Sequence, residues 1–191
     1  DRRDAFRLDL ITVGRQVLGN YFLDVKMEFD RMVEAKDYQA LKACGEKIKE
    51  ILNDLDKLNA FHPYCSLDKW IVDARKMGDS PQLKDYYEKN ARNLITTWGG
   101  SLNDYASRSW AGLISDYYAK RWEVYIDTFI KAVGEGVEVD QKQLEDELKE
   151  IEEGWVNATD RKDTRKDVHS TTDGLLSFST FLFSKYQRLV K

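Results

Sequence analysis

Hydrophobic residues recur at intervals of three and four along most of the chain, which is the spacing of one face of an α-helix. The first such run extends from Asp4 to about Ala35 and predicts a long amphipathic helix. Its apolar positions are Phe6, Leu10, Val13, Val17, Tyr21, Val25, Phe29 and Met32. Because neither a capping residue nor a lead-in loop precedes this helix, we expect the chain to be a fragment of a longer protein.

Polar caps and helix-breaking residues divide the rest of the chain into further helices. A helix that begins at the N-cap Asp37 ends at His62-Pro63, and Gly99-Gly100 ends another. The ranges predicted in this way are 37–61, 66–77, 80–98, 140–159 and 175–190, with N-caps at Asp37, Ser66, Ser80 and Asp140. Residues 160–171 are polar and predict a surface linker.

The densest apolar segment runs from Tyr105 to about Val133, and its bulky residues cover more than one face of a helix. A helix of this kind is normally surrounded by others, so we place it at the centre of a bundle. Residues 137–139 are too few to predict more than a short β-bridge. The sequence therefore predicts an all-α fold, a single domain of about seven helices over residues 1–191.

Composition removes several classes of function. The chain has 191 residues, only two prolines and a net charge of −4, with an isoelectric point near 5.4. It has no basic field to attract nucleic acid or an anionic membrane surface. No apolar stretch approaches the 17–25 residues of a spanning helix, so we expect no membrane insertion.

Individual residues offer little catalytic chemistry. Cys44 and Cys65 lie in no metal-binding or disulfide spacing, which leaves their redox state open, and His62 and His169 are too far apart to suggest a metal site. The acidic residues alternate with lysines at helical spacing, as on a solvated face. We expect no catalytic residue, no metal and no cofactor in this chain. Asn157-Ala158-Thr159 is a glycosylation sequon, and the sequence does not tell whether it is used.

The segment from Trp98 to Tyr105 differs from the rest, because two aromatic residues bracket a short polar loop between helices. One interpretation is the rim of a sugar site, where an aromatic face covers the sugar and Asn103 or Asp104 binds its hydroxyl groups. The other is a helix stop and an N-cap with both aromatics packed beneath the turn, which the local pattern alone favours. The cluster 117–122 likewise fits core packing with a buried arginine ion pair better than a recognition surface.

Longer strings resemble one known family. Trp98-Gly99, followed by LNDYASRSWAGLISDYYAKRW at 102–122, is similar to the C-terminal domain of the α-N-acetylglucosaminidases of glycoside hydrolase family 89. The strings at 55–58 (LDKL) and 70–75 (WIVDAR) resemble the same family in the same order. The resemblance covers residues 10 to 135.

The resemblance implies that this helical domain packs on an upstream (β/α)8 catalytic barrel, within a retaining exo-glycosidase that removes terminal α-linked N-acetylglucosamine from glycans. Both catalytic carboxylates would lie in the barrel, so this chain alone is expected to be inactive. It would contribute substrate-binding residues to the sugar pocket at Trp98, Leu102 and Tyr105. An extracytoplasmic location, periplasmic, secreted or lysosomal, is implied in the same way.

An alternative from a different class remains open. The chain could be a free-standing helical module whose aromatic surface binds a protein partner. A reading frame that encodes a barrel upstream of Asp1 would favour the glycosidase, and a start codon at Asp1 would favour the interaction module.

Overall fold

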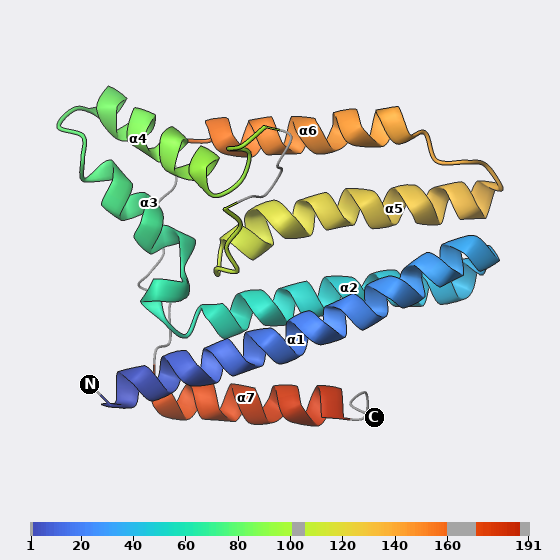
Figure 1. Cartoon of the computed structure of the whole chain (residues 1–191), viewed down its shortest axis with the longest axis horizontal. Coiled ribbons are helices and arrows are strands. Elements are labelled where there is room, and N and C mark those ends of the chain that lie inside the picture. Colours follow the sequence, from blue (N-terminus) through green and yellow to red (C-terminus); the bar gives the residue numbers. More distant parts are fainter. Residues whose placement is uncertain (1, 101–105, 160–170, 188–191) are drawn as a thin grey trace.

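The structure, a computed structural model, describes residues 2–100, 106–159 and 171–187. This part of the chain forms seven α-helices, one short 3-10 helix and one short π-helix, and contains no β-strand (Figure 1). The prediction of an all-α fold is confirmed. No helix among these residues is long and apolar enough to cross a membrane.

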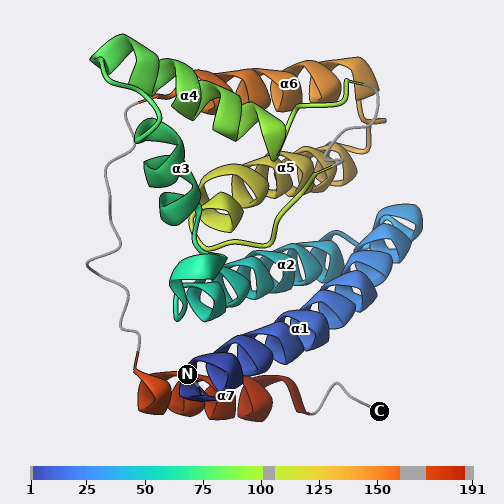
Figure 2. The ribbon, with the colours of Figure 1, turned by 60° about the vertical axis from the view of Figure 1, so that its left-hand side comes forward.

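The helices stack in a row that is closed at one end (Figures 1 and 2). In the row, α7 lies against α1, α1 pairs with α2, α5 lies over α2, and α6 lies over α5, while α3 and α4 close the end where α4 meets α6. The α-helices are α1 (Arg2–Ala35), α2 (Tyr38–Asn59), α3 (Leu67–Arg75), α4 (Pro81–Leu94), α5 (Ala119–Glu135), α6 (Gln141–Asn157) and α7 (Thr172–Tyr186). The 3-10 helix is η1 (Pro63–Cys65) and the π-helix is η2 (Ile114–Tyr118).

The first two helices form the base of the bundle. The predicted N-cap Asp37 is confirmed, because its carboxylate accepts the backbone N–H of Ala40 at 3.0 Å. Two glycines let α2 approach its neighbours closely. A Cβ on Gly14 would lie 2.7 Å from Leu58, and one on Gly45 would lie 2.7 Å from Ile126. Helix α2 therefore packs against both α1 and α5, and it buries more residues than any other described helix.

Helices α3 and α4 begin where their caps predict. The hydroxyl of Ser66 accepts the N–H of Asp68, and the hydroxyl of Ser80 accepts the N–H of Leu83. Helix α4 ends at Leu94, earlier than the predicted Trp98, because residues 95–100 form turns. An ion pair joins the two helices. Glu88 of α4 is completely buried and lies 2.6 Å from Arg75 of α3 and 2.6 Å from Arg92 of its own helix.

The predicted central helix begins later than the sequence indicated. Residues 106–111 are not helical, residues 101–105 lie outside the described part, and π-helical structure starts at Ile114. The carboxylate of Asp56 caps this start by accepting the N–H groups of Gly112 and Ser115 at 2.8 and 3.0 Å. Helix α5 then lies between α2 and α6 (Figure 1) and ends at Gly136, whose φ is 69°.

The last two helices follow their predictions closely. Asp140 caps α6 through the N–H of Gln143, and Thr171 caps α7 (172–186), which begins three residues before the predicted start at 175. Residues 188–190 of that prediction lie outside the described part of the chain. Residues 137–139 form no bridge. The isolated bridge in the described chain joins Ser66 to Ala111. The predicted linker 160–171 lies outside the described residues except for Thr171.

Candidate functional site

The loop singled out by the sequence starts from a firmly held helix end. Ile95 and Thr96 are buried, and the hydroxyl of Thr96 donates to the Arg92 carbonyl at 2.7 Å. The N–H of Trp98 donates to the Asn93 carbonyl at 2.9 Å. Gly99 and Gly100 follow with φ values of 107° and 57°, which L side chains rarely adopt. The chain therefore leaves the helix at a fixed place.

The far end of the loop is tied to another part of the bundle. The N–H of Ala111 donates to the Cys65 carbonyl at 2.8 Å, and the N–H of Leu67 donates to the Ala111 carbonyl at 2.9 Å. These two bonds hold Ala111 against the junction between η1 and α3. Trp110 packs beside Trp70, with 5.8 Å between the ring centroids. Loops held by a rigid scaffold at both ends are common carriers of function.

Trp98 is the one of the three predicted sugar-contacting residues that the structure describes. Its side chain is 50% exposed, so half of this large aromatic surface is accessible in this domain. Leu102 and Tyr105 lie outside the described residues, as do Asn103 and Asp104. Their assignment to a sugar site, and that of Trp98, stays a prediction.

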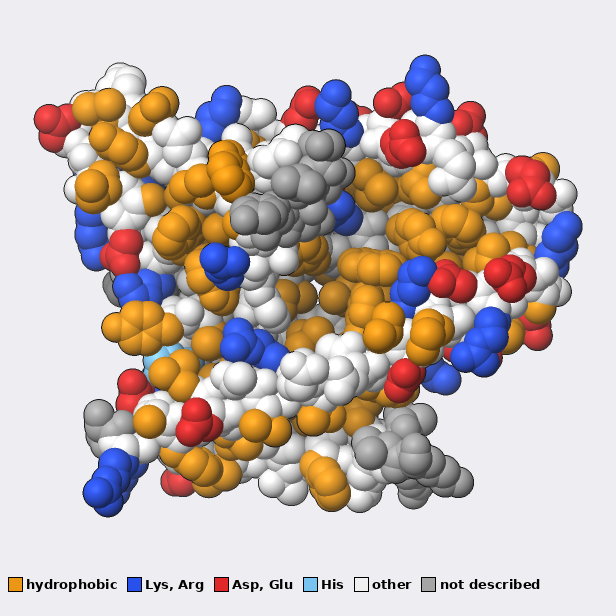
Figure 3. Space-filling view, viewed as in Figure 1, with side chains coloured by type: hydrophobic (Ala, Val, Ile, Leu, Met, Phe, Trp, Pro, Cys, Tyr) orange, Lys and Arg blue, Asp and Glu red, His pale blue; other side chains and the backbone are white. Residues whose placement is uncertain are grey.

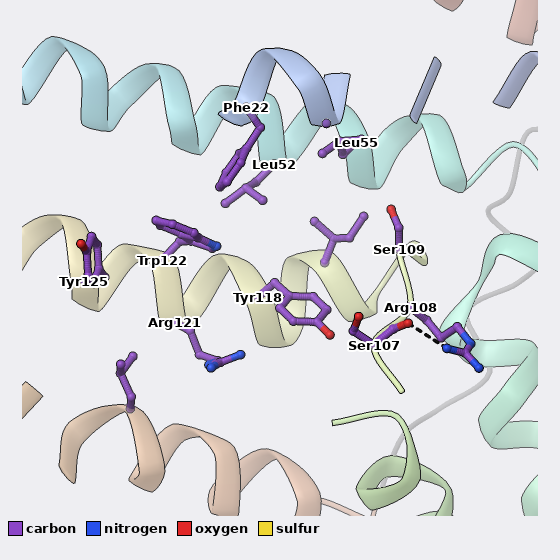
Figure 4. Close-up of a pocket in the computed structure, with 13 residues that line it drawn as sticks. Phe22, Leu52, Leu55, Ser107, Arg108, Ser109, Tyr118, Arg121, Trp122 and Tyr125 are labelled. Atoms are coloured by element: carbon purple, nitrogen blue, oxygen red, sulfur yellow. Dashed lines mark hydrogen bonds between the residues drawn. The ribbon is translucent and has the colours of Figure 1, made fainter. Parts of the chain in front are cut away.

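A cavity of about 530 Å³ opens where the residues after this loop reach the bundle (Figures 3 and 4). Phe22, Leu52 and Leu55 line it from α1 and α2, and they face Tyr118 and Trp122 across the space. The rest of the lining consists of Gly19, Ser107, Arg108, Ser109, Ile114, Arg121, Tyr125 and Leu148. The cavity has the mainly apolar lining with a few polar groups that is typical of binding sites.

Ring contacts fix the walls of this cavity. Trp122 meets Phe22 edge to face at 4.9 Å and packs beside Tyr125 at 5.4 Å. Arg121 lies over the ring of Tyr117 at 5.1 Å and extends toward α6, where it pairs with Glu152 at 2.9 Å. The buried Tyr117 and this partly buried ion pair fit the core interpretation of the cluster. Tyr118, Arg121 and Trp122 are partly exposed and line the cavity, so the choice between the two interpretations stays open.

The described lining contains no carboxylate, histidine or thiol; its polar side chains are two serine hydroxyls, two tyrosine hydroxyls and two guanidinium groups, which can form hydrogen bonds with a ligand. In residues 2–100, 106–159 and 171–187, no group of three or more metal-ligating side chains lies close enough to hold a metal ion.

His62 has a structural setting. It is 2% exposed, its Nδ1 accepts the N–H of Tyr64, and its Nε2 lies 3.0 Å from the carboxylate of Asp4. Because Nδ1 is an acceptor, Nε2 carries the proton and donates to Asp4. This hydrogen bond lowers the pKa of Asp4. The contact joins the start of α1 to the end of α2.

Comparison with known proteins identifies the domain. The sequence model of the family described as "Alpha-N-acetylglucosaminidase (NAGLU) C-terminal domain" matches residues 1–178, which is nearly the whole chain. The chain belongs to this family.

One curated relative is the human protein "Alpha-N-acetylglucosaminidase", which is 30% identical over 160 residues. The match covers 82% of this chain and 22% of the human protein. The chain therefore spans about a fifth of the length of this relative.

Solved structures of a family 89 glycoside hydrolase from Clostridium perfringens share the fold. One, in complex with its substrate GlcNAc-α-1,4-galactose, has a TM-score of 0.82 and 27% sequence identity, and the match covers 98% of this chain and 22% of that one. Another, in complex with 2-acetamido-1,2-dideoxynojirimycin, has a TM-score of 0.81, with 27% identity and coverage of 96% and 21%. The fold of the family is thus retained throughout this domain.

The cavity was not predicted from the sequence. Phe22, Leu52 and Leu55 have the helical spacing of core residues, and nothing local separates a cavity wall from a filled core. Gly19 of α1 also lines the cavity, and an added Cβ there would meet no atom within 4 Å.

Proposed function

We propose that this domain serves a retaining exo-glycosidase that hydrolyses terminal α-linked N-acetylglucosamine, and that it contributes part of the sugar pocket without contributing a catalytic carboxylate. In this proposal the domain packs on an upstream (β/α)8 barrel that carries the two carboxyl groups. Retaining glycosidases hold such groups about 5 Å apart, one as nucleophile and one as acid and base.

The match of residues 1–178 to the C-terminal domain of the α-N-acetylglucosaminidases is the observation that carries this proposal. The substrate complex of the Clostridium perfringens relative supports the substrate class. An indole with half of its surface accessible suits the apolar C–H face of a sugar, and the fixed helix end at Asn93 gives Trp98 a defined position. An extracytoplasmic location is part of the proposal, because glycan substrates of this kind occur outside the cytoplasm.

The test uses the full-length protein that contains this domain. It should hydrolyse an aryl α-N-acetylglucosaminide, and NMR of the early product should show the α-anomer, as expected for retention. An aryl β-N-acetylglucosaminide is the matched control and should not be hydrolysed. If neither substrate is hydrolysed, the proposed activity is wrong. If the first product is the β-anomer, the proposed retaining mechanism is wrong.

A further inference from the structure

The cavity beside Trp122 has two chemically different ends (Figure 4). Trp122 and Tyr125 lie toward one end, which we call the aromatic end, and Ser107, Arg108 and Ser109 lie at the other, the polar end. The aromatic end offers ring faces and edges, while the polar end offers hydroxyl and guanidinium donors. A ligand that fits both ends has an apolar body and a hydrogen-bond acceptor at one side.

The size and the rigidity of the cavity suit a small organic molecule. Its volume of about 530 Å³ is within the range of sites that hold drug-sized ligands. Trp122 is held by its ring contacts with Phe22 and Tyr125, and the lining residues Leu52 and Leu55 are buried. Walls that are already in place lose little conformational entropy when a ligand packs against them.

Arg108 brings a positive charge to the polar end. Its Nη1 donates to the carbonyls of Ala106 and Ser107 at 2.8 and 2.9 Å, and its side chain is exposed. In the part of the chain that the structure describes, the arginine–carboxylate pairs involve other arginines. The Nε and Nη2 edge of Arg108 can therefore donate two charge-assisted hydrogen bonds to a carboxylate or a sulfonate.

A second guanidinium lies beside the same segment. Nη1 of Arg15 donates to the Ser109 carbonyl at 3.4 Å, and Nη2 donates to the Thr12 hydroxyl at 3.3 Å. Arg15 likewise belongs to none of the arginine–carboxylate pairs among the described residues. It precedes the lining residue Gly19 by one helical turn, so both lie on the face of α1 that borders the cavity. Two such charges beside apolar walls favour an anion.

Other charged groups nearby leave this positive charge in place. Arg121 also lines the cavity, but it pairs with Glu152 at 2.9 Å. The carboxylate of Asp56 accepts the N–H groups of Gly112 and Ser115 and is not part of the lining. The polar end is thus positive in a chain whose net charge is −4.

We propose that this cavity binds an aromatic organic anion, a ring system that carries a carboxylate or a sulfonate. The rings of the ligand pack against Trp122 at the aromatic end, and its oxygen atoms accept hydrogen bonds from Arg108 at the polar end. The proposal does not depend on the hydrolysis of N-acetylglucosaminides, because its test measures binding alone.

Two fluorescent probes test the ligand class in the full-length protein. Anilinonaphthalene sulfonate is an aromatic anion, and phenylnaphthylamine has the same rings without the sulfonate. The fluorescence of both rises in an apolar environment, so a titration with each probe gives its affinity. The difference between the two affinities measures the contribution of the negative charge.

Substitutions at two glycines and two arginines locate the site. Gly19→Leu narrows the cavity, because Gly19 lines it and an added Cβ would meet no atom within 4 Å. Gly154→Leu is the matched control, since Gly154 is also an exposed helical glycine with open space at its Cβ, and it does not line the cavity. Arg108→Gln removes the charge at the polar end. Arg31→Gln removes the same charge from an exposed pair with Glu28.

Gly19→Leu should weaken the binding of anilinonaphthalene sulfonate at least about tenfold, and Gly154→Leu should leave it unchanged. Arg108→Gln should weaken the sulfonate at least about threefold without changing the affinity of phenylnaphthylamine, and Arg31→Gln should change neither. Melting curves show which variants are folded. If Gly19→Leu does not fold, the comparison of Arg108→Gln with Arg31→Gln still decides.

Three results would overturn the proposal. The first is the absence of saturable binding of the sulfonate to the unsubstituted protein. The second is equal affinity of the folded Gly19→Leu variant and the unsubstituted protein, which places the probe elsewhere. The third is an Arg108→Gln variant that binds the sulfonate as the Arg31→Gln variant does, because the cavity then does not select an anion.

Discussion

Glu88 and Arg92 form a completely buried ion pair one helical turn apart on α4, with Nη2 of the arginine 2.6 Å and Nε 2.9 Å from the same carboxylate oxygen. The second oxygen of Glu88 accepts from Arg75, and Arg92 also donates to the Trp155 carbonyl. One carboxylate therefore pairs with two guanidinium groups, and the contacts of these groups join α3, α4 and α6.

Removing that carboxylate should be costly. We expect Glu88→Gln to lower the free energy of unfolding by about 3–5 kcal/mol, because it leaves the buried Arg92 charge without a counter-ion. Urea unfolding of the protein that contains the domain measures this. Glu46→Gln is the control, since Glu46 makes an exposed contact with Lys49 at 3.5 Å and should change stability by less than about 0.5 kcal/mol. Equal effects of the two substitutions would show that the pair contributes little.

Trp98 distinguishes a sugar-binding loop from a structural one. In the full-length enzyme, Trp98→Ala should lower kcat/KM about 5- to 150-fold, because the loss of an aromatic contact with the sugar removes about 1–3 kcal/mol of transition-state binding. Trp98→Phe retains an aromatic face and should recover part of the loss. Melting curves on the same preparations are needed, because a ring packed beneath the turn would instead cost stability. A less stable Trp98→Ala enzyme with unchanged kcat/KM would show that the loop is structural.

The predicted role of Tyr105 is tested separately. Tyr105→Phe keeps the ring and removes the hydroxyl, so a hydrogen bond to a sugar hydroxyl would be lost while apolar contact remained. We expect kcat/KM to fall by about 5- to 10-fold, the loss of a hydrogen bond worth roughly 1 kcal/mol. An unchanged kcat/KM would show that the Tyr105 hydroxyl makes no hydrogen bond that matters to the reaction, which leaves only contact through the ring.

Asp56 caps the start of η2, and its contribution to folding stability depends on pH. Burial raises the pKa of Asp56 above 3.8, although the N–H groups of Gly112 and Ser115 oppose this. The folded protein then binds the proton more tightly than the unfolded chain, so the contribution of Asp56 to stability falls as the pH rises from about 3.8 through the raised pKa.

Asp56→Asn keeps an acceptor oxygen and cannot titrate. Its stability relative to the wild type should therefore increase as the pH rises through this window, as measured by urea unfolding at several pH values. Asp56→Ala, which removes both accepted hydrogen bonds, should be less stable at every pH, by about 1–2 kcal/mol at neutral pH. A pH-independent difference between Asp56→Asn and the wild type would contradict the raised pKa.

Tyr186 attaches α7 to α2. Its hydroxyl donates to the buried carboxylate of Asp54 at 2.7 Å, and Lys185 contacts the same oxygen at 2.8 Å. Tyr186→Phe should lower the free energy of unfolding by about 1.5–3 kcal/mol, the usual range for a hydrogen bond to a charged group. Tyr64→Phe is the control because Tyr64 is 64% exposed. Hydrogen exchange in α7 should accelerate only in Tyr186→Phe.

Caps and periodicity predicted the helices well because both are local. The side chains of Asp37, Ser80 and Asp140 each accept the N–H of the residue three positions further along the chain, so a short stretch of sequence contains the whole interaction. The start of the helix after Tyr105 was wrong for the opposite reason. Ala111 bonds to Cys65 and Leu67, residues far away in sequence, and this keeps the segment before η2 out of a helix.

The candidate site, too, was predictable from the sequence only where its features are local. Trp98 stood out because Gly99-Gly100 follows it, and the structure places both glycines at positive φ. The cavity beside Trp122 depends instead on how four helices meet, and the spacing of Phe22 and Leu55 is that of an ordinary core. Sequence periodicity specifies which face of a helix is apolar, and it does not specify whether the partner face fills the space.

The bridge between Ser66 and Ala111 holds the two ends of the segment between them side by side. Helices α3 and α4 pack with η2 and α6 in one cluster of buried residues, while α1, α2, α5 and α7 share another. Insertions and deletions between residues 100 and 106 would change the reach of the loop without moving either anchor. A change of loop length at this place is therefore compatible with unchanged packing of the helices beneath it.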